Sequence, residues 1–162
     1  VGANPLSKTD PRGLDNPGMG PYGPDNSTHN YTWSTFRCMG DCTKQTMREL
    51  LCNPAPGVTP SNPTQDGDVN MVRLAGIDLG NITTVVSQTG NTTWNVTRPG
   101  HTLHPGWVRR DVVFDGKATW VVNTGGGTGF NPLNLNTILA PIVWGGTNPS
   151  RLPSDAGCGC EK

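Results

Sequence analysis

Two histidines and two arginines lie close together in the second half of the chain. His101 and His104 are three residues apart in a turn between two Pro-Gly corners, and Arg109 and Arg110 follow on the next predicted strand. An imidazole titrates near neutral pH and can move protons, while a guanidinium fork matches the geometry of phosphate oxygens. These residue types favour acid–base chemistry at a phosphodiester. A tight turn whose imidazoles bond only to the backbone explains the same pattern equally well.

The reaction that fits these groups is metal-independent transesterification of RNA, with no cofactor. One neutral imidazole would take the proton of the 2′-hydroxyl and the other would protonate the leaving oxygen, while one of the two arginines would stabilise the charged phosphorane-like state. Thr124 and Thr128, on and after a later predicted strand, are candidates to orient the phosphate. The catalytic hypothesis therefore rests on six side chains from one turn, two strands and the glycine run after the second strand.

Composition predicts the scaffold that carries these groups. The chain has 162 residues with 22 glycines and 15 prolines, which favours a single α+β domain with long Gly/Pro-rich loops over a helical bundle. Twelve basic residues balance twelve acidic ones, so the chain as a whole lacks a strongly electropositive surface for nucleic acid. No apolar run is long enough to be a transmembrane segment.

Periodicity predicts one helix and a small, mostly antiparallel sheet. Asp41 can cap a helix from Thr43 to Cys52 that ends before Asn53-Pro54, where proline cannot continue the pattern. Hairpin signals at 89–91 and at Asp115-Gly116 join neighbouring strands. The expected strands are residues 70–75, 82–87, 92–97, 107–114 and 118–124.

A glycine run follows the last of these strands. Residues 125–129 precede Asn131-Pro132, a good start for a second helix that ends near Val143. Backbone amides of such a run can cradle phosphate, although this one matches neither a Walker motif nor a dinucleotide fingerprint. A flexible connection between strand and helix is the plainer interpretation.

Five cysteines give an odd set. Cys38 could pair with Cys42 or with Cys52 and clamp the first helix to the loop before it, which would suit an exported protein. A zinc site from these three cysteines and a histidine has weak support, because no Cys-x-x-Cys pair is present. We therefore expect disulfide-bonded or free cysteines in preference to a metal site.

Asn4-Pro5-Leu6 followed by Asp10-Pro11-Arg12-Gly13-Leu14 is specific in order and spacing. It resembles the end of the core of Rhs-family (rearrangement hotspot) proteins, in which repeats form a closed β-shell around a toxin passenger. The resemblance covers about a tenth of the chain. It implies that Asp10 is one of two self-cleaving carboxylates and that the chain is cut after Leu14. The partner Asp-Pro-x-Gly motif of the family is not found here.

The resemblance also implies an antibacterial toxin released from a secreted effector, often exported by type VI machinery and delivered into a target cell. Expected partners are a cognate immunity protein and the Rhs shell of the parent protein, with RNA as substrate. The predicted organisation is the core end at residues 1–14, a linker or arm at 15–40, the toxin domain at 41–146 and a tail at 147–162.

Three other functions stay open. Arg109 or Arg110 could grip the phosphates of NAD in an ADP-ribosyltransferase or another NAD-using toxin. Neutral charge and disulfides would suit a toxin that acts in the periplasm or on a membrane without nuclease activity. A non-enzymatic binding or pore-forming module would leave the histidines and arginines with structural roles.

Overall fold

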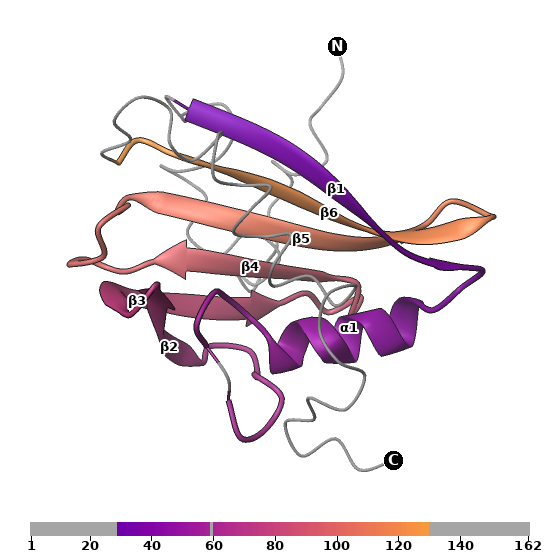
Figure 1. Cartoon of the computed structure of the whole chain (residues 1–162), viewed down its shortest axis with the longest axis horizontal. Helices are drawn as coiled ribbons and strands as arrows, with labels where there is room; N and C mark the ends of the chain where they lie inside the picture. The colour runs from indigo at the N-terminus through magenta and orange to yellow at the C-terminus, as the bar shows by residue number, and fades with distance from the viewer. Residues whose placement is uncertain (1–28, 59, 130–162) are drawn as a thin grey trace.

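The computed structural model describes residues 29–58 and 60–129. Within these residues, six strands form one antiparallel sheet in the order β1-β6-β5-β4-β3-β2, and one helix lies against it (Figure 1). This arrangement confirms the predicted α+β fold with a small antiparallel sheet. The elements are β1 (His29–Met39), α1 (Thr43–Cys52), β2 (Val69–Leu74), β3 (Ile77–Val86), β4 (Thr92–Thr97), β5 (Gly106–Phe114) and β6 (Ala118–Gly127).

Helix α1 has the predicted bounds. The Asp41 carboxylate accepts hydrogen bonds from the backbone N–H and the hydroxyl of Thr43, at 3.0 and 2.6 Å, and so satisfies one N–H of the first turn, although the N-cap position itself is Cys42. Met47 and Leu50 project from one side of the helix and pack on Val112 and Val121 of the sheet. Burying such side chains stabilises the fold by about 1.5–3 kcal/mol each.

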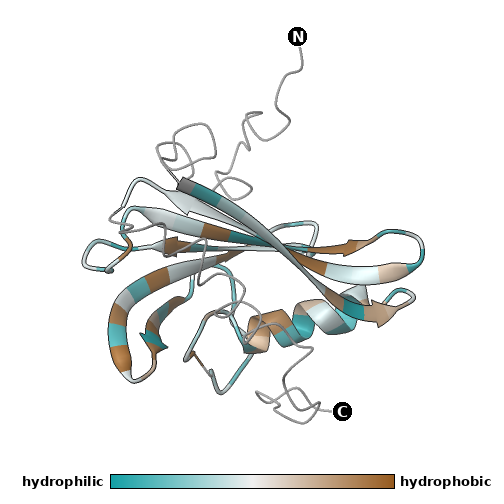
Figure 2. Ribbon diagram, turned by 45° about the horizontal axis from the view of Figure 1, so that its top comes forward, coloured by the Kyte–Doolittle hydropathy of each residue, from teal (hydrophilic) through white to brown (hydrophobic). Residues whose placement is uncertain are grey.

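The sheet is apolar on parts of both faces. Val112 and Val121 lie on the face that α1 covers, which we call the helix face. Val85, Trp94 and Trp107 form a second buried cluster, and strand alternation places them on the opposite face. Figure 2 shows hydrophobic and hydrophilic residues mixed along the strands, so the apolar clusters cover only part of each face.

Strand β1 differs from the sequence prediction of a linker or arm over residues 15–40. Residues 29–39 pair with β6 in a long antiparallel ladder that aligns Trp33 with Asn123. The segment is rich in Asn, Thr and Ser, so its sequence carries little of the alternation that marks a half-buried strand. Its partner lies some ninety residues later, and no local signal reports such a pairing.

The glycine run is also different from its predicted role as a connection. Gly125 to Gly127 belong to β6 and are buried. A Cβ at Gly125 would collide with the Tyr31 ring, so the absent side chain lets that ring lie on the strand. The glycines therefore serve close packing, whereas the predicted second helix after residue 130 lies outside the described residues.

Strands β2 and β3 form a hairpin that is not among those predicted from the sequence. Ala75 and Gly76 both have positive φ, 51° and 81°, which is the conformation of a two-residue turn of the type I′ class. Strand β2 consequently ends at Leu74, and β3 starts at Ile77 rather than at residue 82. The sequence does not predict this turn, because alanine seldom adopts a positive φ.

Candidate functional site

His101 is held inside the turn that joins β4 to β5. Its ring Nδ1 accepts a hydrogen bond from the backbone N–H of Leu103 at 3.0 Å. The backbone N–H of His101 donates to the Arg98 carbonyl. Only 7% of the residue is exposed. A Cβ on Gly80 would lie 2.5 Å from the His101 Cα, so the turn packs directly on β3. Burial, followed by the charge of nearby His104, lowers the pKa of His101.

His104 is tied to the end of β4. Its Nδ1 lies 3.0 Å from the Thr97 carbonyl oxygen and 3.2 Å from the Thr97 hydroxyl. That hydroxyl donates to the Gly106 carbonyl and accepts from the Gly106 N–H. Since a carbonyl only accepts, Nδ1 of His104 carries the proton and donates to Thr97. Both histidines thus hydrogen-bond to the backbone of their own turn or its flanks.

Arg110 is completely buried on the helix face. Its Nη1 donates to the carbonyls of Asn53 and Pro54, at 2.9 and 3.1 Å, where the chain leaves α1. Burial lowers the pKa of Arg110 to about 9, partly offset by Tyr31, so the guanidinium stays protonated at neutral pH. The buried cation thus joins the sheet to the carbonyl end of the helix.

Arg109 lies on the opposite face. It donates to the Asp111 carboxylate, with Nε and Nη2 at 2.9 and 2.8 Å from Oδ1, and its guanidinium carbon is 5.7 Å from the centre of the Trp94 ring. Across the ladder it is paired with Thr124 of β6. The strand alternation predicted from sequence therefore resolves as Arg110 in the core and Arg109 half-buried.

The sheet separates the predicted catalytic groups. Arg109 and Thr124 share one face, while Arg110 lies beneath the other. Thr128 belongs with the histidine turn, because its N–H donates to the Pro105 carbonyl at 3.1 Å. The histidine–arginine mechanism stays a prediction, and no single cluster of these six groups is evident among the described residues. Asp10 and Leu14 lie outside the described residues.

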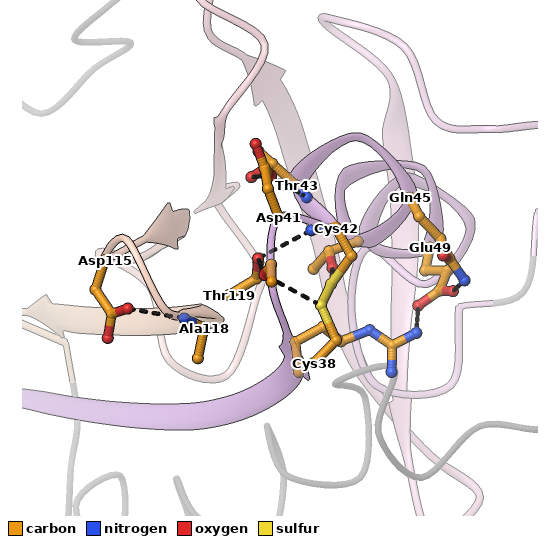
Figure 3. Close-up of a disulfide and its surroundings, with 12 residues drawn as sticks. Cys38, Asp41, Cys42, Thr43, Gln45, Glu49, Asp115, Ala118 and Thr119 are labelled. Carbon is orange, nitrogen blue, oxygen red and sulfur yellow. Dashed lines mark hydrogen bonds and ion pairs between the residues drawn. A yellow bond between two sulfur atoms is a disulfide. The ribbon is translucent and has the colours of Figure 1, made fainter.

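A disulfide joins Cys38 to Cys42, one of the two predicted partners, and clamps the end of β1 to the start of α1 (Figure 3). Thr119 of β6 reinforces this corner, because its hydroxyl donates to the Gly40 carbonyl and accepts from the Cys42 N–H. Cys52, at the other end of α1, is also disulfide-bonded. The two remaining cysteines of the sequence lie outside the described residues.

Sequence reasoning missed a buried polar cluster beside Arg110. The Thr84 hydroxyl donates to the Asn95 side-chain oxygen at 2.9 Å, and the Asn95 amide donates to the Pro54 carbonyl that Arg110 also contacts. These residues sit at register-matched positions on β3 and β4. Polar residues in a strand normally indicate a solvent-facing side, so no sequence signal places them under a helix.

The described residues hold no group of three side chains suited to a metal ion. They also contain no helix of the length and apolarity that a bilayer crossing needs. The fold and its bonds define a disulfide-bonded α+β domain with a twisted six-stranded sheet and one covering helix. Compared with known proteins, the chain gives no match to a family model, to a curated protein or to a solved structure.

Proposed function

We propose that this chain carries the toxin domain of an Rhs-type effector and that the domain acts in an oxidising compartment of the target cell, such as the periplasm. Support for the first part is the Rhs-like signature of residues 4–14. Support for the second is the Cys38–Cys42 disulfide. Export would deliver the domain with its shell, and a cognate immunity protein would protect the producing cell.

The disulfide is the observation that carries the choice of compartment. Disulfides persist in secreted and periplasmic proteins, whereas the cytosol of most bacteria keeps thiols reduced. Here the bond fixes the first strand to the only helix among the described residues, and that helix covers the apolar core. Cys52, at the far end of the same helix, is also disulfide-bonded. Reducing conditions would loosen both ends of α1.

Ribonuclease chemistry is the second candidate. The observation that favours it is the adjacency of Arg109 and Thr124 on neighbouring strands, which sets a guanidinium and a hydroxyl on one face of the sheet. In this candidate Arg109 stabilises phosphate charge and a histidine moves the proton. Its substrate is found in the cytoplasm, so the two candidates predict toxicity in different compartments.

Expression of the full chain in a test bacterium separates these candidates. The chain is produced once without and once with a periplasmic export signal, and growth and RNA integrity are followed over time. We expect growth to fall only with export, with intact RNA, and the Cys38→Ser/Cys42→Ser variant to be weaker. Toxicity in the cytoplasm with degraded RNA would support the ribonuclease instead. Full growth in both arms would refute the toxin proposal.

A further inference from the structure

We propose that the turn formed by residues 99–105 is an acid-sensitive latch, in which protonation of His101 detaches the turn from β3 and releases the backbone at Thr128 and Gly129. The inference is independent of the target of the toxin. It rests on how the turn is fastened at its two sides and on a ring nitrogen that accepts a hydrogen bond inside the turn, next to the backbone bonds from His101 to Arg98 and from His104 to His101.

The turn is fastened on one side to β3. Thr102 donates from both its N–H and its hydroxyl to the Leu79 carbonyl, at 2.8 and 3.2 Å. Gly80 lies against the backbone of His101, and any side chain at Gly80 would push the turn away. The close packing of Gly80 against the turn depends on the backbone conformation around His101.

On its other side the turn holds the chain that follows β6. The Pro105 carbonyl accepts hydrogen bonds from the N–H groups of Thr128 and Gly129, at 3.1 and 3.0 Å. Cβ atoms built on Gly127 and Gly129 would collide with Pro105 and with Leu103. The turn and this segment therefore stay together only while both keep their positions.

The Nδ1 atom of His101 is the sensitive point. It accepts a hydrogen bond from the backbone N–H of Leu103, two residues later in the chain, and this bond stabilises the turn. A protonated Nδ1 is itself a donor, so it could no longer accept the Leu103 N–H and this hydrogen bond would be lost. The residue is nearly fully buried, so the charged ring would also lack water. Both effects favour a turn that opens when the ring is charged.

Few charged groups face the ring. His104 of the same turn repels a proton on His101. The contacts described for the turn involve Leu79 and Gly80 of β3, Thr97 of β4 and Gly127 to Gly129, none of which titrates. Arg98 precedes the turn and is exposed, while Asp78 of β3 is paired with Arg73. No carboxylate among these contacts would stabilise a charged His101.

Hydrogen exchange of the full chain between about pH 5 and pH 7.5 tests the latch, with rates corrected for intrinsic exchange. We expect the protection of the amides of Thr102, Thr128 and Gly129 to fall several-fold at the acidic end. The Gly90 amide, in the β3–β4 turn that contains no histidine, is the internal control. Unchanged protection at the three amides would overturn the proposal.

Two variants assign the effect to one ring. In His101→Asn the side-chain oxygen can accept the Leu103 N–H in an Asx turn but cannot titrate, so protection should become independent of pH. In His104→Asn the amide can still donate to Thr97, so the pH dependence should remain. Loss of the dependence only in His104→Asn would refute the role of His101.

A measurement on the unmodified protein covers the case in which a variant fails to fold. NMR titration of the wild-type imidazoles gives the pKa of each ring. The amide shifts of Thr128 and Gly129 should follow the titration of His101. If they follow His104 instead, or do not titrate in this range, the latch is refuted.

Discussion

Arg110 occupies a position that few charged side chains occupy in proteins. It is fully buried, and its Nη1 donates to the carbonyls of Asn53 and Pro54, which lie directly after the C-terminus of α1, where the helix dipole is negative. Asn95 donates to one of the same carbonyls. The guanidinium therefore satisfies main-chain carbonyls of the segment that leaves α1, and its role in the described structure is to hold this segment, and with it the end of the helix, against the sheet.

We expect Arg110→Met to destabilise the protein by about 2–3 kcal/mol, because the partly buried Asn53 carbonyl and the buried Pro54 carbonyl would both lose a charged donor. Urea unfolding measures the loss. Arg109→Met is the matched control on the next residue, and removing its partly exposed pair with Asp111 should cost less than about 1 kcal/mol. Equal losses for both variants would argue against the role given to Arg110.

At the level of elements, the sequence predicts those parts whose determinants are local. The bounds of α1 and β4 agree with periodicity, and so does the hairpin at Asp115-Gly116. Strand β1 is missed because its pairing partner is β6, which is remote in sequence. The candidate site is predicted as residue types in one turn and one strand, but pleating sends Arg109 and Arg110 to opposite faces, and only the packing of α1 decides which is buried.

The Cys38–Cys42 bond acts on the junction of β1 and α1. We expect Cys38→Ser/Cys42→Ser, with Cys52 left unchanged, to lower the free energy of unfolding by roughly 2 kcal/mol, which is the chain-entropy value for so short a loop. Urea unfolding without reductant is the measurement. Hydrogen exchange in the first turn of α1 should rise as well. Wild-type stability in the double variant would show that Thr119 alone holds this corner.

For the whole molecule, the buried histidine links stability to pH. The folded state lowers the pKa of His101 below its ordinary value of 6.5, so the unfolded chain binds this proton more tightly. The contribution of neutral His101 to the free energy of unfolding should be fully present above about pH 6.5. It should decline as the pH falls toward the pKa of His101 in the folded state. Asp41 and Asp115 also have lowered pKa values, but they act only below their ordinary value of 3.8.

Urea unfolding at a series of pH values between about 5 and 8 is the test. The wild-type protein should lose stability at the acidic end, and His101→Asn should give a flatter profile over the same range. A wild-type profile that is flat, or a variant profile that is just as steep, would exclude His101 as the source.

The sheet order places the first described strand beside the last. Because β1 pairs only with β6 among the described strands, the ladder that aligns Trp33 with Asn123 can form only after both ends of the domain are available. During synthesis the full β1–β6 ladder can form only after residue 127 has left the ribosome. In a nascent chain that stops before β6, β1 has no strand to pair with. Completion of the sheet is therefore a late event, with a loop of about ninety residues to close.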